Sequence, residues 1–202
     1  MVNRREKYLI ELKARDRDFI VAIHEAAHAV ACHRLGVAFH RVSISREGGS
    51  GVAAVDTETV SCLDRGSNDS VGEALRLERF AARCRAQIIV AYAGPSAELR
   101  GARCGLTAAV GLASGAKDER DARFFVRELV KAEVEIAAKK GEYVVKLEDL
   151  PQRFVEKLEA LHREAEALVE ADFEVIEAVA RRLADVGQLS SADVAELSDL
   201  AR

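Results

Sequence analysis

Two histidines four residues apart, His24 and His28, constrain the fold of this chain more than any other feature of its sequence. On an α-helix such residues lie about 40° apart around the axis, so both imidazoles would project from one face. Ala31 and Leu35 share that face, which predicts that the rings point toward an apolar core. Because unpaired polar groups are costly to bury, the pair needs either a shared metal ion or hydrogen-bond partners from elsewhere in the chain.

The neighbouring residues favour the helix that this pair requires. Apolar side chains recur at helical spacing over residues 16–35. Asp16 or Asp18 is suited to cap the start of the helix, and Gly36 is suited to end it.

Glu25, which directly follows His24, is a candidate proton acceptor beside the histidine pair. It would lie about 100° around the helix axis from His24, beside a metal ion held by the histidines rather than bound to it. From that position its carboxylate can take a proton from water. The pattern His-Glu-x-x-His on a helix is typical of zinc sites in which the glutamate is a general base. We therefore expect a zinc ion bound by His24 and His28, with Glu25 as the catalytic base.

The composition limits the class of protein. With 202 residues, 49% of them hydrophobic, and no linker-like tract, the chain fits a single domain over residues 1–202. The net charge of −4, without a basic stripe, argues against a nucleic-acid partner. No apolar signal-peptide segment follows the basic N-terminus, and no apolar run approaches the roughly 18 residues of a membrane span.

The cysteines bear on the compartment. Four of them are widely spaced and form no Cys-x-x-Cys motif, which is typical of small buried side chains in a reducing environment. They are Cys32, Cys62, Cys84 and Cys104. We expect a cytoplasmic protein.

Helical periodicity dominates the remaining sequence, which predicts a mainly α protein with a small β-sheet (α+β). The expected sheet has a strand over residues 39–45, a glycine turn and a second strand over residues 51–55. A loop rich in Ser, Asp, Gly and Asn follows over residues 57–74, and residues 143–145 are expected to be extended.

Four further helices are expected, over about residues 73–92, 118–140, 156–186 and 191–200. Gly94-Pro95 would interrupt the chain after the first of these helices. A break is expected near Asp172 in the third, and Ser191 is suited to cap the last.

A catalytic zinc site usually has three protein ligands, so a third ligand must come from outside the motif. Asp118 is the best candidate, because in a helix that begins near it Asp118 shares an inward face with Ala122 and Leu129. The same carboxylate could instead be a plain helix cap that accepts hydrogen bonds from backbone N–H groups. Asp121 is intermediate between the apolar and polar faces. Spacing alone leaves both roles of Asp118 open.

Several short motifs occur in one order along the chain. They are His-Glu-Ala-Ala-His-Ala at residues 24–29, a strand and glycine-rich turn at 40–51, Gly-x-x-Ala-Glu at 94–98, Asp118 with an alanine four residues later, and Leu-Ser-Ser-Ala-Asp-Val-Ala-Glu-Leu at 189–197. In this order the sequence resembles the peptidase domain of the FtsH-type ATP-dependent zinc metalloproteases, over roughly residues 12–200. That family carries Gly at the fourth position of the first motif, where this chain has Ala27.

The resemblance implies a zincin-like metallopeptidase domain followed by a C-terminal helical bundle. About residues 12–110 would supply the motif helix, the small sheet and the second helix. About residues 111–202 would supply the third-ligand helix and the C-terminal helices.

The resemblance also implies roles for individual residues. The implied zinc ligands are His24, His28 and Asp118, and the implied general base is Glu25. Gly115-Ala116 lies one residue closer to the aspartate than in the family pattern, so Asp121 is kept as the reserve ligand.

The implied activity is that of a zinc-dependent endopeptidase acting on peptides or unfolded proteins. The family's ATPase module and membrane anchor have no counterpart here, and no Gly-x-x-x-x-Gly-Lys-Ser/Thr loop occurs, so ATP-independent cleavage is expected. A partner protein could deliver the substrate. The strand near residues 42–45 could pair with an extended peptide or be an ordinary edge strand, and Glu98 could support the metal site or be structural.

Two alternatives stay open. A di-iron carboxylate bundle would use Glu25-x-x-His28 and Glu159-x-x-His162, although His24 and the two-stranded segment have no role in such a bundle. A zinc-stabilised peptide-binding module without activity is the other, although such a module would not require Glu25.

Overall fold

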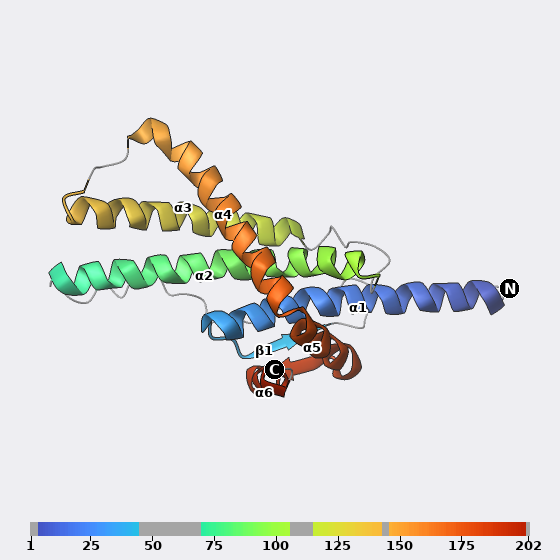
Figure 1. Ribbon diagram of the computed structural model, residues 1–202. Helices are drawn as coiled ribbons and strands as arrows, with labels where there is room; N and C mark the ends of the chain where they lie inside the picture. Colours follow the sequence, from blue (N-terminus) through green and yellow to red (C-terminus); the bar gives the residue numbers. More distant parts are fainter. Residues whose placement is uncertain (1–3, 45–69, 106–114, 143–145, 201–202) are drawn as a thin grey trace.

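The computed structural model describes residues 4–44, 70–105, 115–142 and 146–200 (Figure 1). The described elements are α1 (Arg4–Leu35), β1 (Arg41–Ser43), α2 (Ser70–Arg103), α3 (Gly115–Lys139), the 3-10 helix η1 (Leu147–Asp149), α4 (Leu150–Ala171), α5 (Phe173–Val186), β2 (Gln188–Ser190) and α6 (Ser191–Leu200). The prediction of a mainly α protein with a small β-sheet is confirmed.

The motif helix α1 begins well before the predicted start. Its backbone is helical from Arg4, so Asp16 and Asp18 lie inside the helix, and the prediction that one of them caps it is wrong. The added residues contain good helix formers and neither glycine nor proline, so nothing in them stops the helix. Figure 1 shows this N-terminal part of α1 extending beyond the other helices.

Helix α2 also differs from the prediction, because it continues through Gly94-Pro95 to Arg103. A proline inside a helix removes one backbone N–H and usually kinks or ends the helix. Here α2 packs against α1, α3 and α4, and Ala93 and Ala97 on either side of the proline are fully buried. Tertiary contacts thus hold this segment helical against its local preference.

The later helices lie near their predicted ranges, except that α4 begins at Leu150, before the predicted start near residue 156. α3 begins three residues before Asp118, which therefore lies in its first turn. α4 and α5 are separated at Asp172, as expected. α5 ends at Gly187, whose φ of 81° is a left-handed conformation that glycine adopts without strain.

The two-stranded sheet joins distant parts of the chain. β1 pairs antiparallel with β2, with Val42 opposite Leu189. The predicted partner strand over residues 51–55, most of the loop over 57–74 and the extended segment over 143–145 lie outside the described residues.

Helix α6 follows β2 directly, and its cap is not the predicted Ser191. Ser190 Oγ accepts a hydrogen bond from the Asp193 backbone N–H, and Asp193 Oδ2 accepts one from the Ser190 backbone N–H. This reciprocal pair is a capping box, one residue before the predicted position.

Two apolar clusters form the core. One joins α1, α5 and α6 with both strands, and the other joins α2, α3 and α4. α2 contributes residues to both clusters, and Figure 1 shows it between α1 and α3. Within the described part of the chain, no helix combines the length and the apolar character needed to cross a membrane.

Candidate metal centre

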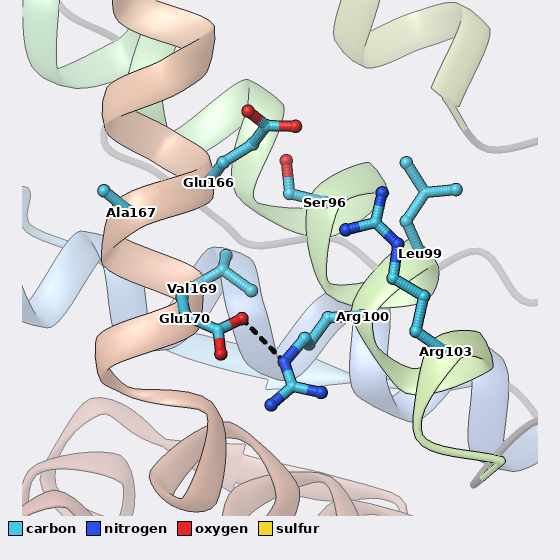
Figure 2. A pocket seen from close by; sticks show the side chains of 8 residues that line it. All are labelled: Ser96, Leu99, Arg100, Arg103, Glu166, Ala167, Val169 and Glu170. Atoms are coloured by element: carbon cyan, nitrogen blue, oxygen red, sulfur yellow. Dashed lines mark ion pairs between the residues drawn. The ribbon is translucent and has the colours of Figure 1, made fainter.

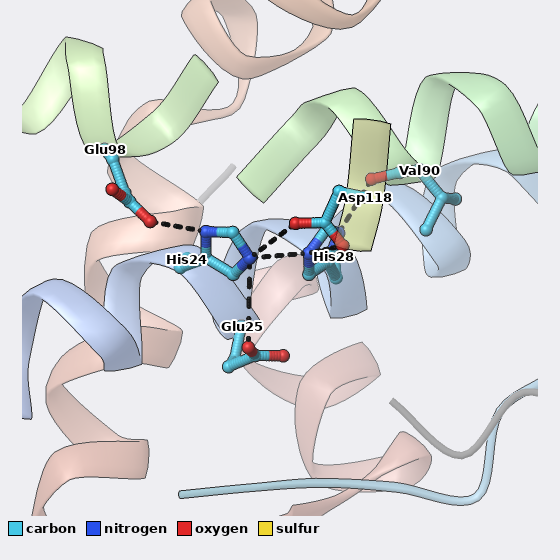
Figure 3. A network of polar contacts seen from close by, with 6 residues as sticks. All are labelled: His24, Glu25, His28, Val90, Glu98 and Asp118. Carbon is cyan, nitrogen blue, oxygen red and sulfur yellow. Dashed lines mark hydrogen bonds and ion pairs between the residues drawn. The ribbon is translucent and has the colours of Figure 1, made fainter. Parts of the chain in front are cut away.

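The two motif histidines lie side by side on the buried face of α1 (Figure 3). His24 Nε2 and His28 Nε2 are 2.9 Å apart, and the rings meet nearly edge to face, at 82°. The helical spacing of four residues thus places both imidazoles as predicted.

Asp118 reaches the same point from the first turn of α3. Its Oδ2 lies 3.1 Å from His24 Nε2, and its Oδ1 lies 3.7 Å from His28 Nε2. His24, His28 and Asp118 each offer one ligand atom, and these atoms all lie within 4.8 Å of one another. The reserve candidate Asp121 is exposed and does not belong to this group.

The outer nitrogen of each imidazole is already engaged by α2. His28 Nδ1–H donates a hydrogen bond to the backbone carbonyl of Val90 (2.7 Å). His24 Nδ1–H donates one to Glu98 Oε1 (2.6 Å). A carbonyl or carboxylate oxygen can only accept, so the proton sits on Nδ1 in both rings and Nε2 carries the lone pair. Glu98 therefore contacts one of the candidate ligands directly.

The consequence is that two neutral imidazoles would face each other lone pair to lone pair across 2.9 Å. Such an arrangement requires a cation between the nitrogens, either a proton or a metal ion. Asp118 Oδ2 is also buried without a hydrogen-bond partner of good geometry among the described residues. Buried polar atoms without partners are uncommon in folded proteins, and a coordinated ion would supply one here.

The pKa shifts of His24 and Asp118 also indicate that this group favours a bound positive charge. Burial acts to lower the pKa of His24, but hydrogen bonding to Asp118 and Glu98 prevails and raises it to about 10. Burial acts to raise the pKa of Asp118, yet the two imidazoles hold that pKa well below its usual range. Without a metal ion, the group therefore carries a proton on His24 and a negative charge on Asp118.

The donor set fits a small divalent cation. Two imidazole nitrogens and one carboxylate are ligands that zinc takes in catalytic sites, and a tetrahedral ion with bonds of about 2.0–2.1 Å separates its ligand atoms by about 3.3 Å. The observed separations of 2.9, 3.1 and 3.7 Å lie around that value. The geometry identifies a site that could bind a metal ion.

Glu25 lies beside this group rather than in it. Its Oε1 is 3.9 Å from His24 Nε2, and the side chain is buried. Burial raises the pKa of Glu25 above its usual value, although the electrostatic interaction with the neighbouring imidazoles, His28 and His24, acts against this rise. A buried carboxylate with a raised pKa beside a candidate cation site is suited to accept a proton and to return it.

Gly94 lies at the site although the sequence predicted no contact with the histidines for it, only an interruption of the helix and the first position of the Gly-x-x-Ala-Glu motif. A Cβ at this position would lie 2.6 Å from His28 Nε2 and 2.7 Å from His24 Nε2. The available signal was a glycine four residues before Glu98, inside the short apolar run over residues 88–97.

Tyr92 ties the neighbouring helices together close to the site. Its ring stacks on His162 of α4, with centroids 4.4 Å apart. Burial raises the pKa of Tyr92 to about 12, and a hydrogen bond to Glu119 adds to this rise. Glu119 follows Asp118 directly, so this contact helps to fix the first turn of α3 against α2.

The second Glu-x-x-His pair of the di-iron alternative lies elsewhere. Glu159 is exposed, His162 stacks on Tyr92, and neither belongs to the metal-capable group found among the described residues.

A cavity of about 300 Å³ lies between α2 and α4 (Figure 2). It is lined by Ser96, Leu99, Arg100, Arg103, Glu166, Ala167, Val169 and Glu170. At 100° per residue, the lining residues of α2 project from the face opposite Gly94 and Glu98. Arg100 pairs with Glu170 across the cavity (2.6 Å). The metal-capable group does not contribute to this cavity.

Comparison of the sequence with protein-family models and with curated proteins finds no match.

Proposed function

We propose that this chain is a zinc-dependent endopeptidase with a zincin-like metallopeptidase domain. The observation that carries the proposal is the arrangement of the two imidazoles. Both Nδ1 atoms are engaged by α2, while both Nε2 atoms and the Asp118 carboxylate converge on one point. Glu25 lies next to that point without joining it. This division of roles is the one that metal-assisted peptide hydrolysis requires.

Each residue would have a distinct task. His24, His28 and Asp118 would hold the ion, which when bound would act as a Lewis acid on water and on the scissile carbonyl. Glu25 would accept the proton of the attacking water and return it to the leaving amine. Glu98 and the Val90 carbonyl would keep the imidazoles in the tautomer and orientation that the ion needs.

The resemblance to FtsH-type peptidase domains also supports zinc-dependent peptide hydrolysis, because the resemblance rests on several motifs that occur in the same order. Three of its segments, at residues 24–29, 94–98 and around Asp118, meet at the candidate metal centre. We propose peptides and unfolded proteins as substrates, cleaved by this chain without ATP.

The test measures metal content and cleavage together. Purified protein is analysed for zinc and iron, and its cleavage of unfolded casein is followed with and without a chelator. We expect one zinc per chain, activity that the chelator abolishes, and loss of both in a His24→Ala/His28→Ala variant. His33→Ala, which alters a half-buried histidine on the same helix, serves as the control and should retain both. Two irons per chain would favour the di-iron alternative, and zinc without any cleavage would favour a binding module.

A further inference from the structure

The backbone of α2 passes unusually close to the candidate metal centre at Gly94. A Cβ there would lie 2.6 Å from His28 Nε2 and 2.7 Å from both Cε1 and Nε2 of His24. These distances are well below ordinary contact, and they involve the two nitrogens that would bind the ion. A methyl group at this position would therefore occupy the space in front of the ligand atoms.

The imidazoles cannot turn away to make room. His24 is held by its 2.6 Å hydrogen bond to Glu98, and His28 by its 2.7 Å hydrogen bond to the Val90 carbonyl. Both rings are buried and both partners belong to α2 itself. The helix that carries Gly94 thus also fixes the rings that a side chain at this position would strike.

The α2 backbone cannot easily retreat either. Ala93, directly before Gly94, and Ala97, three residues after it, are fully buried in the core. Pro95 follows directly and restricts the local backbone further. Both the imidazole rings and the α2 backbone are thus held in place. The space in front of the two Nε2 atoms therefore stays open only because Gly94 has no Cβ.

We propose that Gly94 is a positioning residue that keeps the ion's volume open between α1 and α2. The inference rests on the metal binding of the proposed function and adds a determinant outside the His-Glu-x-x-His motif. A rival explanation is that glycine is needed only to let the helix bend next to Pro95. That rival predicts the same effect of a substitution whether or not the histidines are present.

The first experiment compares zinc affinity in Gly94→Ala and Gly115→Ala by competition with a chromophoric chelator. Gly115 lies at the start of α3, and a Cβ there would meet only Pro95 Cγ, at 3.7 Å, which is ordinary contact. We expect Gly94→Ala to lose at least about 100-fold in affinity, above the usual effect of groups that merely orient ligands. Gly115→Ala should match the wild type. Equal zinc affinity in Gly94→Ala and the wild type would overturn the proposal.

The second experiment keeps the proposal testable if Gly94→Ala fails to fold. Urea unfolding with chelator present is measured for Gly94→Ala in the wild-type background and in a His24→Ala/His28→Ala background. With the histidines present, the urea midpoint should fall. Without them it should rise or stay unchanged, because alanine is the better helix former. An equal fall in both backgrounds would support the rival explanation and overturn ours.

The two proposals can fail separately. A wild-type protein that binds no zinc would refute the proposed function, while the urea comparison would still report on the steric role of Gly94. Zinc binding by the wild type together with full binding by Gly94→Ala would refute only the role of Gly94.

Discussion

The carboxylate of Glu98 on α2 accepts a 2.6 Å hydrogen bond from Nδ1–H of His24 on α1, and both side chains are buried. The contact sets the tautomer of His24 and turns its Nε2 toward His28 and Asp118. It also ties the helix with the His-Glu-x-x-His motif to the helix with Gly94. The candidate metal centre is thus shared between helices, and the geometry of its potential ligands depends on residues outside the motif.

Removal of this contact should weaken metal binding without abolishing it. Glu98→Ala leaves Nδ1 of His24 without its acceptor, and groups of this kind typically contribute 10–100-fold to metal affinity. Glu98→Gln keeps an amide oxygen that can accept the same hydrogen bond, so a smaller loss is expected. Zinc affinity of the two variants can be measured by chelator competition. Equal affinities in Glu98→Ala and the wild type would mean that Glu98 does not position His24.

Glu25→Gln should separate metal binding from hydrolysis. Glutamine is nearly isosteric but cannot accept a proton, so we expect full zinc content and a cleavage rate about 10²–10⁴-fold lower. Zinc analysis, circular dichroism and casein cleavage measured on the same preparation check this expectation. Unchanged turnover in the variant would remove Glu25 from the role of general base.

The metal-free protein should lose stability as the pH rises above neutrality. The pKa of His24 is raised to about 10 in the folded protein, from 6.5 in an unfolded chain. The folded state therefore binds more protons than the unfolded state between these values. This contribution is fully present below pH 6.5 and is lost as the pH rises through about 10, at a rate of the order of 1 kcal/mol per pH unit.

The measurement is urea unfolding with chelator at pH 6.5, 7.5 and 8.5, with His24→Gln as the matched control. Burial raises the pKa of Cys32 to about 12, but its effect begins nearer pH 9 and is common to both proteins. The wild type should lose stability relative to the control across this range. Parallel pH profiles would show that His24 is not protonated in the metal-free site.

Unfolded substrates should be cleaved much faster than folded ones by this chain alone. A folded substrate must open before an extended segment can reach a buried site, and full opening costs about 5–15 kcal/mol for a typical domain. The test compares casein with a stable folded domain of similar size, with and without ATP. Equal rates on both substrates, or a requirement for ATP, would contradict the proposed substrate class.

Parts of the fold that depend on local spacing were predictable. The shared face of His24 and His28 and the inward direction of Asp118 follow from helical periodicity, and the structure brings all three together. The break at Asp172 was predicted for the same local reason. Such features are encoded within a few turns of helix, which a single sequence displays directly.

Other parts were mispredicted because packing opposed the local signal. Gly94-Pro95 normally ends a helix, yet α2 continues to Arg103 where the core surrounds it. The strand over Gln188–Ser190 has no alternating pattern long enough to reveal it, and its pairing with Arg41–Ser43 spans most of the chain. A pattern within a short window carries no information about such a partner.

The sequence by itself determined the side chains that could bind a metal ion and the helix faces that carry them, because side-chain chemistry and the 3.6-residue period are local properties. Only the tertiary structure decided that α2 lies against the motif helix with Gly94 facing the imidazoles, Glu98 on one ring and the Val90 carbonyl on the other. These contacts join residues more than 60 positions apart. Their geometry depends on how buried helices fit together, which is a property of the whole core rather than of any segment.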